Sequence, residues 1–303
     1  MTLDEQIRQH LNENALTWYC ENYDTLLNTP DEKTLYLSIS LATRKVGKSS
    51  IKINNDSRTW TIDQAVRVVF LANMNPLLPN HRLWIDRFFT TADQNELVAI
   101  YQGIFYLPVP QFWLDKALFA ARSNMTSIFL AIAYQNKFPC LYFSEDAWNQ
   151  LVLKTLCLNF ALSPIIGLTQ RMNSNLREIF YENVLDQWAA NRLVNPELWM
   201  CMANHLDEKT INLLSTVLEK NERIEQLTAI WALQHSKLES ANKLLSRYRS
   251  LQAIVADTGF GLHSVNCSIS NRTFSPSHEG DDWDVGEIKG ETLGTININK
   301  DVS

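Results

Sequence analysis

Glycine is distributed unevenly along this chain, and its distribution constrains the fold more than any other feature. Six of the nine glycines lie in residues 259–303, so only Gly47, Gly103 and Gly167 interrupt the first 258 residues. That long stretch also lacks the Asn-Gly and Asp-Gly dipeptides that mark tight hairpin turns. Strands joined by short turns would need such residues, so we predict an all-α fold for residues 1–258.

Helical spacing and helix-start signals support this prediction. Apolar residues recur three and four positions apart, as in residues 213–218, which is the pattern of an amphipathic helix. Asp93 and Glu96 have the spacing of a capping box. Ser144 and Asn173 each stand directly before a helical segment, where a short polar side chain can accept a free backbone N–H group.

The last part of the helical region indicates how the helices are arranged. From residue 205 three amphipathic segments follow one another with very short connections. Consecutive antiparallel helices of this kind are typical of HEAT-like or α-solenoid arrays. We expect about a dozen helices between residues 3 and 256, forming one domain that extends over residues 1–258.

Residues 259–303 differ in composition from the rest of the chain. They are rich in Gly, Ser, Asn and acidic residues and hold few large apolar side chains. A segment of this kind buries too little apolar surface to offset the entropy lost on ordering. We expect a flexible, disordered C-terminal tail, in which Asp281, Asp282 and Asp284 form a solvated acidic patch and not a magnesium site.

Composition excludes several classes of protein. The net charge of −6 argues against a nucleic-acid partner, because phosphate binding needs a basic surface. No apolar run approaches the roughly 18 residues of a membrane-spanning helix, and the N-terminus has no secretory signal. Five cysteines without CxxC spacing indicate free thiols in the cytoplasm.

Motifs that resemble catalytic or cofactor sites fail on closer comparison. Gly47-Lys48-Ser49 would belong to a phosphate-binding loop only if glycine stood in place of Ala42. The polar segment that follows, residues 51–61, is predicted to be a loop. The six histidines show no zinc-ligand spacing, and no serine or cysteine lies in a nucleophile elbow. The sequence therefore predicts no metal, no cofactor and no recognisable catalytic residue.

The segment from Ser144 to Phe160 carries the most informative polar residues. At 100° per residue, Asn149 falls within the apolar arc of this helix, whereas Gln150 and Lys154 share a polar stripe. A buried amide without a partner costs about 1–3 kcal/mol, so Asn149 must bond a helix end, a loop carbonyl or a ligand. A helix end is the favoured partner, because buried polar groups usually serve such ends.

Nearby helix junctions bring further polar residues into this region. We predict that these residues and the polar residues of the helix at 144–160 meet where three helix ends converge. They would form the most polar concavity of the central region, suited to an anion or a carbonyl-bearing ligand. The alternative is that they satisfy one another and the backbone. The candidate set comprises Arg122, Asn124, Asn149, Gln150, Lys154 and Arg171.

Several motifs between residues 93 and 199 match the pattern of a known family. They are DQNELVAIYQGIFYLP, RSNM, AWNQLVLK, IIGL, RMN and QWAANRLVNPELW, in this order. AWNQLVLK, at residues 147–154, is the strongest of them. With these motifs the chain resembles the EboA family of bacterial metabolite-traffic proteins.

The resemblance implies a fold, partners and a location. It implies a HEAT-like helical array, in agreement with the periodicity. Family members are encoded beside a membrane prenyltransferase-like protein and several soluble enzymes, and the group is associated with moving a secondary-metabolite precursor out of the cytoplasm. The implied partners are a small-molecule metabolite, the prenyltransferase-like protein and other proteins of the same gene cluster. The implied location is the cytoplasm, with peripheral attachment to the inner membrane through a partner.

Three functions remain open at this point. The resemblance and the lack of a catalytic pattern favour a non-catalytic binding or adaptor protein in precursor traffic or export. The first alternative is an enzyme acting on a prenylated or aromatic small molecule, with a site assembled between helices. The second is a purely structural helical scaffold for neighbouring enzymes.

Overall fold

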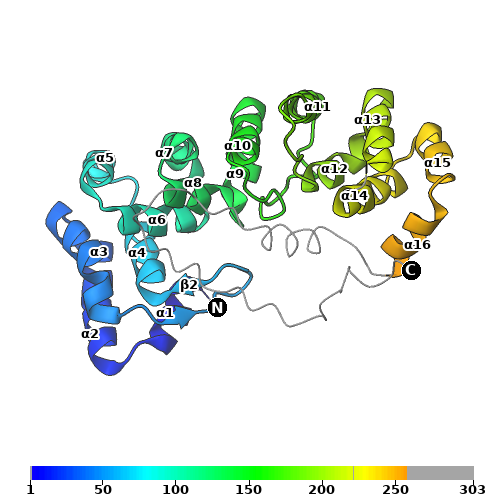
Figure 1. Cartoon of the computed structure of the whole chain (residues 1–303). Coiled ribbons are helices and arrows are strands. Elements are labelled where there is room, and N and C mark those ends of the chain that lie inside the picture. Colours follow the sequence, from blue (N-terminus) through cyan, green and yellow to red (C-terminus); the bar gives the residue numbers. More distant parts are fainter. Residues whose placement is uncertain (1, 221, 258–303) are drawn as a thin grey trace.

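The computed structural model describes residues 2–220 and 222–257, and helices dominate these ranges (Figure 1). Within them, sixteen α-helices are joined by loops, two short 3₁₀ helices and one two-stranded hairpin. This confirms the all-α prediction, although the helices are more numerous than the dozen predicted. The predicted tail, residues 259–303 with its acidic patch, lies outside the described residues.

The N-terminal part of the chain holds four helices and the hairpin. Asn12 and Asp31 start α2 and α3 by accepting backbone N–H groups from the first helical turn. Gly47 ends α3 with φ at 80°, a conformation that glycine adopts without strain. The elements are α1 (Leu3–His10), α2 (Glu13–Asn28), α3 (Glu32–Val46), β1 (Ser50–Ile51), β2 (Trp60–Thr61) and α4 (Ile62–Ala72).

The middle of the chain begins its helices where the sequence predicts. Asp93 and Glu96 form a reciprocal capping box at the start of α6. Ser144 accepts the N–H of Ala147 at the start of α10. The elements are α5 (His81–Thr91), α6 (Gln94–Gly103), η1 (Ile104–Tyr106), α7 (Pro110–Arg122), α8 (Thr126–Ala133), α9 (Lys137–Tyr142) and α10 (Glu145–Cys157).

The C-terminal part contains one more helix than the sequence predicts. The third predicted segment is divided by a turn at residues 246–248, which lets its two halves pack differently. The first half contacts α13 and α14, and the second contacts α14. The elements are α11 (Ser174–Ala189), α12 (Glu197–Met202), η2 (Ala203–His205), α13 (Glu208–Glu219), α14 (Arg223–Gln234), α15 (Glu239–Leu245) and α16 (Arg249–Asp257).

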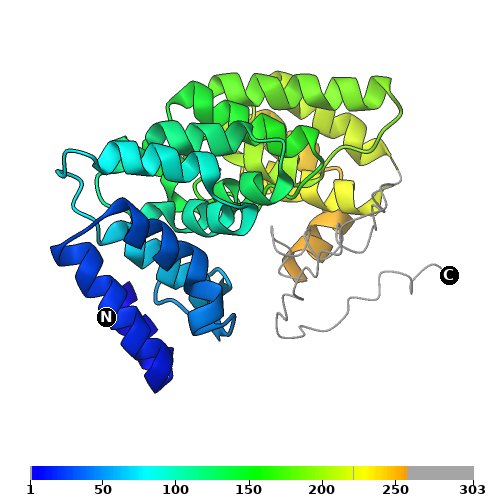
Figure 2. The ribbon, with the colours of Figure 1, turned by 90° about the vertical axis from the view of Figure 1, so that its left-hand side faces the viewer.

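The helices from α4 onward form an arc of two rows (Figure 1). The outer row consists of α5, α7, α10, α11, α13 and α15, which lie side by side (Figure 2). The inner row consists of α4, α6, α8, α9, α12, α14 and α16. Inner neighbours contact each other along both halves of the arc, and pairs such as α7 with α8 and α13 with α14 join the two rows.

A loop joins the two halves of the inner row. Residues 158–173 connect α10 to α11 and lie between the α8–α9 turn and α12. The hydroxyl of Tyr134 donates to the carbonyl of Ala161 at 2.8 Å. On the other side, the Glu197 carboxylate accepts the backbone N–H of Leu162. Side chains from both halves of the array therefore fix the loop in place.

The hydrophobic core runs along the whole array. Four fully buried tryptophans mark its course from the hairpin through α7 and α10 to α12. Each large ring fills the space between neighbouring elements, and a side chain of this size contributes strongly to core energy. They are Trp60, Trp113, Trp148 and Trp199.

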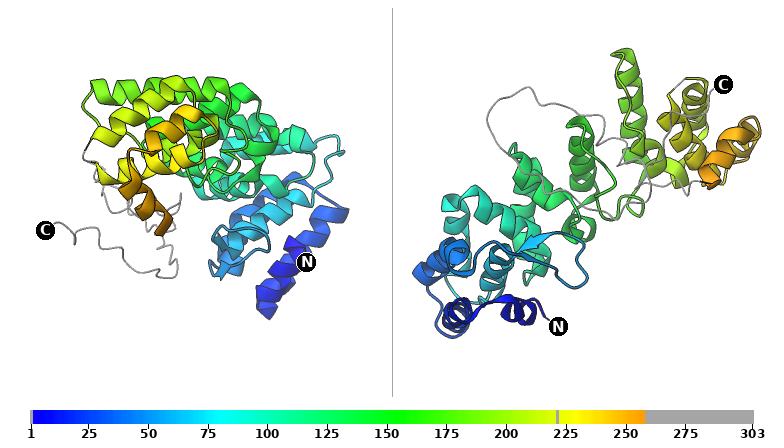
Figure 3. Two further views of the ribbon diagram at one scale, coloured as in Figure 1. Left: turned by 90° about the vertical axis from the view of Figure 1, so that its right-hand side faces the viewer. Right: turned by 60° about the horizontal axis from the view of Figure 1, so that its bottom comes forward.

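The hairpin corrects the prediction of a loop at residues 51–61. Its strands are antiparallel, with Ser50 opposite Thr61 and Ile51 opposite Trp60. Ile51, Ile53 and Trp60 are buried, and the two isoleucines alternate with the exposed Lys52. The hairpin extends from the N-terminal helices toward the middle of the array (Figure 3).

Candidate functional site

The six predicted site residues lie along the junction of α7, α10 and the start of α11. These helices are neighbours, since α10 contacts both α7 and α11. Three of the six side chains are exposed, one is buried and two are half-buried. In that order they are Arg122, Asn124 and Gln150, then Asn149, then Lys154 and Arg171.

Asn149 is buried, as helical spacing predicts, and it pairs with the residue that starts α11. Its side-chain amide donates to Asn173 at 3.3 Å, and the Asn173 amide donates back at 3.0 Å. The Asn173 oxygen also accepts the N–H of Leu176 at 2.8 Å, which confirms Asn173 as the N-cap of α11. The buried amide therefore holds the N-cap residue of a neighbouring helix.

Arg171 donates hydrogen bonds to the carbonyls at the C-terminal end of α9. Its guanidinium donates to the carbonyls of Pro139 at 2.9 Å and Phe143 at 2.9 Å. It also lies over the Trp148 ring, with 4.8 Å from the guanidinium carbon to the ring centroid. The carbonyls at a helix C-terminus lack partners within the helix, so a cation placed there satisfies them.

Lys154 serves the end of α7 and does not pair with Gln150. Its ammonium donates to the carbonyls of Ser123 at 2.6 Å and Ala121 at 3.3 Å. The same ammonium lies 4.7 Å from the centroid of the Phe129 ring. Burial lowers the pKa of Lys154, because a desolvated ammonium is less stable than a solvated one.

The buried and half-buried members of the predicted set thus hold helix ends together. These contacts match the alternative in which the polar residues satisfy one another and the backbone. A ligand-binding concavity shared with Arg122, Asn124 and Gln150 stays a prediction.

A pocket lies elsewhere, where the hairpin meets the inner row. Its cavity volume is ≈ 30 Å³, and four segments far apart in the sequence line it. The segments are the hairpin loop at residues 55–58, η1 with Phe105 and Tyr106, the α8–α9 turn with Gln135 and Lys137, and Ile166 of the long loop.

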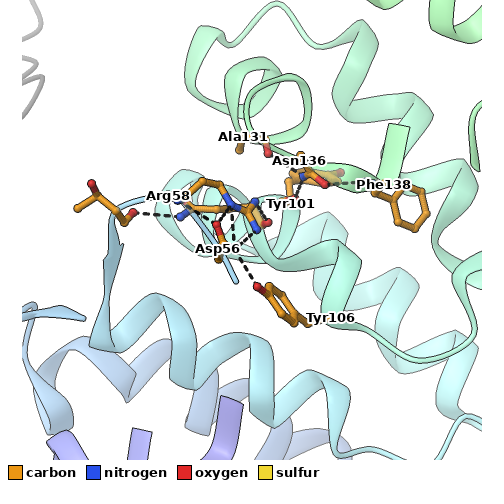
Figure 4. Close-up of polar contacts among 9 residues, drawn as sticks. Asp56, Arg58, Tyr101, Tyr106, Ala131, Asn136 and Phe138 are labelled. Carbon is orange, nitrogen blue, oxygen red and sulfur yellow. Dashed lines mark hydrogen bonds and ion pairs between the residues drawn. The ribbon is translucent and has the colours of Figure 1, made fainter. Parts of the chain in front are cut away.

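An ion pair within the hairpin loop is hydrogen-bonded to η1 and to the end of α6. Asp56 accepts from Arg58 at 2.6 Å and from the Tyr106 hydroxyl at 2.8 Å (Figure 4). Arg58 also donates to the carbonyl of Gln102, and its side chain and that of Asp56 are only 9% and 5% exposed. The two charges therefore neutralise each other with only a small part of either side chain exposed.

The pKa values of this network reflect its pairing. Burial alone would raise the pKa of Asp56, but hydrogen bonds from Arg58 and Tyr106 outweigh it and hold the pKa below its usual value. Burial and the bond to Asp56 raise the pKa of Tyr106 to about 12. Near neutral pH, Asp56 is ionised and Tyr106 keeps its proton.

Asn136 fixes the opposite wall of the pocket. Its buried side chain donates to the carbonyls of Tyr101 at 2.9 Å and Ala131 at 3.0 Å, and it accepts the N–H of Phe138 at 3.0 Å (Figure 4). One side chain thus ties α6, α8 and α9 together. The neighbouring Lys137 is held at the pocket by this arrangement.

The acidic group of the pocket is already paired. The acid of the pocket, Asp56, is committed to Arg58 and Tyr106, so it is a poor general base.

Within residues 2–220 and 222–257, no three His, Cys, Asp or Glu side chains converge as a metal site requires. None of the helices in those ranges has the length and apolar character to cross a membrane.

The family was identified by comparison with known proteins. A family model described as "Metabolite traffic protein EboA" matches residues 1–203 of this 303-residue chain. The chain belongs to the EboA family. No curated protein and no solved structure matches it. The EboA match includes every lining residue of the pocket and ends within η2, although α13–α16 continue the same two rows.

Sequence reasoning missed the pocket because it treated residues 51–61 as a polar loop. One signal was present: Ile51 and Ile53 alternate with polar residues before the turn-forming Asn54-Asn55-Asp56. Nothing local could place this turn beside Phe105 or Lys137.

Proposed function

We propose that this EboA-family chain is a non-catalytic binding or adaptor protein that holds a small metabolite precursor during its transfer or export. The observation that carries the proposal is the match of residues 1–203 to the family model of metabolite-traffic proteins. The small cavity between the hairpin and the inner row lies inside the matched region, and four segments far apart in the sequence line it.

The fold supports an adaptor role in a second way. We propose that the two rows of helices are a HEAT-like α-solenoid formed as one domain over residues 1–258, followed by a flexible tail at 259–303. Such arrays present long surfaces to partner proteins. The proposed partners are a membrane prenyltransferase-like protein and other products of the same gene cluster. Through them the chain would work in the cytoplasm, peripherally attached to the inner membrane.

A capture experiment tests this function. The purified full-length chain is incubated with a small-molecule extract of the source cells, desalted rapidly, denatured and examined by mass spectrometry. We expect one unchanged compound to be recovered at a ratio near one per chain. Conversion of a compound into a product would favour an enzyme. Recovery of a protein partner from cells, with no compound retained in either experiment, would favour a scaffold.

A further inference from the structure

We propose that the acidic segment at residues 279–287, which lies outside the described residues, docks on a basic face at the C-terminal end of the helical array of the same chain. This terminal basic face comprises Lys243, Arg247 and Arg249. The contact goes beyond the proposed function, because metabolite binding does not involve this face.

The terminal basic face lies where the described array ends. α15 is the last described helix of the outer row and α16 is the last of the inner row, so no described helix packs beyond them (Figure 1). The side chain of Gln252 donates to the carbonyl of Leu245, which ties α16 to the end of α15. The last helices of an array present a polar surface, because no neighbour covers them.

The cations of this face are exposed and have no partner among the described residues. Lys243 and Arg247 are one helical turn apart, and Arg249 follows two residues later. None of the three side chains has a hydrogen bond, an ion pair or a ring contact with a described residue. Residues 237–250 hold four cations and only one acid, Glu239, which gives a net charge of +3.

Helix stability does not account for all of this charge. Lys243 lies in the last turn of α15, where the helix dipole favours a cation. Arg249 begins α16, whose first turn holds no acid, and the positive end of that dipole disfavours a cation there. An anionic partner would offset this unfavourable placement.

Residues 279–287 have the complementary charge. Their sequence, EGDDWDVGE, holds five acids and no lysine or arginine. Opposite charges on two surfaces guide their association, and a network of pairs contributes more than a single exposed pair. Trp283 stands among the acids, and the half-buried Tyr248 stands between the two arginines, so the two rings can meet.

The length of the intervening chain fits the contact. Arg249 lies about 12 Å along α16 from Asp257, at about 1.5 Å per residue, and Asp257 is the last described residue. Residues 258–278 separate Asp257 from the acidic segment. For a random coil of this length the root-mean-square span is about 25 Å, which holds a tethered segment at a millimolar local concentration.

Zero-length cross-linking of the full-length chain tests the contact directly. A carbodiimide activates a carboxylate, and a touching lysine amine displaces the activating group to form an amide. We expect a link between Lys243 and residues 279–287, lost in roughly 0.5 M NaCl, where screening shortens the range of the attraction. Mixing isotope-labelled with unlabelled chains separates links within one chain from links between two. Absence of the link to Lys243, or links only between two chains, would overturn the proposal.

A peptide added in trans measures how far the attached segment occupies the face. The receiving chain is a full-length variant in which the five acids of the segment are replaced by amides. We expect the fluorescein-labelled peptide EGDDWDVGE to bind this variant at least threefold more tightly than the wild type, whose own segment competes. Equal affinity for both chains would overturn the proposal. The five replacements are Glu279→Gln, Asp281→Asn, Asp282→Asn, Asp284→Asn and Glu287→Gln.

Two matched sets of substitutions, made in the five-amide variant, locate the face. Neutralising the terminal basic face should weaken the peptide at least tenfold. The control set neutralises three exposed cations at the end of α3, at the opposite end of the molecule, and should leave the affinity unchanged (Figure 1). Equal losses in the two sets would show attraction to any basic surface and overturn the assignment. The sets are Lys243→Gln, Arg247→Gln and Arg249→Gln, and Arg44→Gln, Lys45→Gln and Lys48→Gln.

An anionic membrane is the other occupant that this charge would suit. Wild-type chain is sedimented with vesicles of equal parts phosphatidylcholine and phosphatidylserine. We expect no binding through the terminal basic face, because the chain's own segment covers it. Binding of the wild type that is lost when Lys243, Arg247 and Arg249 are neutralised would show an open face and overturn the proposal.

Discussion

Two polar regions of this array are built from similar residues and are used differently. At the junction of α7, α10 and α11, Lys154 and Arg171 donate to the carbonyls that end α7 and α9. At the hairpin pocket, Arg58 is likewise committed to Asp56, whereas the exposed Lys137 ammonium lies over the Phe105 ring and pairs with no carboxylate of the described residues. The comparison shows that tertiary placement decides which polar side chains are bonded to backbone groups and which stay exposed.

Breaking the ion pair of the pocket should have the largest effect on stability. Asp56→Ala leaves Arg58 buried without a counter-charge, so we expect a loss of about 3–5 kcal/mol in the free energy of unfolding. Urea denaturation measures it, with Asp115→Ala at an exposed site of α7 as the control. The double variant Asp56→Ala/Arg58→Met should lose less than the sum of the single variants. A loss as small as that of the control would show that the hairpin is not held by this pair.

Breaking the amide pair of the junction should come next. Asn149→Ala removes the partner of Asn173 and loosens the N-cap of α11, which should cost about 1–3 kcal/mol. Gln150→Ala, at the exposed neighbouring position of the same helix, should change stability by less than about 0.5 kcal/mol. Equal effects of the two substitutions in urea denaturation would remove the structural role assigned to Asn149.

These two regions also show what a sequence can and cannot predict. Asp93, Ser144 and Asn173 start helices where predicted, because an N-cap acts on backbone groups only two or three residues away. The burial of Asn149 was predictable for the same reason, since helical periodicity is local. Features that depend on neighbouring positions are therefore visible in the sequence.

Features that depend on distant segments are not visible in it. The partner of Lys154 is the end of α7, 31 residues earlier in the chain, whereas spacing on α10 alone places Lys154 only on a polar stripe with Gln150. The pocket depends on Lys137 lying beside a hairpin about 80 residues away, and the hairpin's two-residue strands give little periodic signal. The tertiary structure therefore decides which polar side chains are hydrogen-bonded within the protein.

Removing the lysine of the junction should have a smaller effect on stability. Lys154→Met keeps the aliphatic stem but loses the ammonium that satisfies the Ala121 and Ser123 carbonyls. We expect a loss of about 1 kcal/mol, seen as a thermal midpoint about 2–4 °C lower. Lys243→Met provides the control with no expected shift. An unchanged midpoint in Lys154→Met would mean that water molecules hydrogen-bond these carbonyls equally well.

The smallest effect is a difference in acid sensitivity between the two regions. The pKa of Asp56 is lower in the folded chain than in the unfolded one, so its contribution is present above about pH 4 and is lost as the pH falls further. At pH 4 we expect a loss of a few tenths of a kcal/mol, with faster hydrogen exchange in residues 50–61. The Asn149–Asn173 amide pair does not titrate, so exchange in residues 145–157 should change less. Parallel changes in both segments would contradict the separate roles of these networks.

The most direct test of the account compares two lysines of the same array. Thermal midpoints are determined for Lys137→Met and Lys154→Met beside the wild type. We predict that Lys154→Met lowers the midpoint by about 2–4 °C, because its ammonium bonds the carbonyls that end α7, and that Lys137→Met, at an exposed position, leaves the midpoint unchanged. A lowered midpoint in Lys137→Met beside an unchanged one in Lys154→Met would contradict the account.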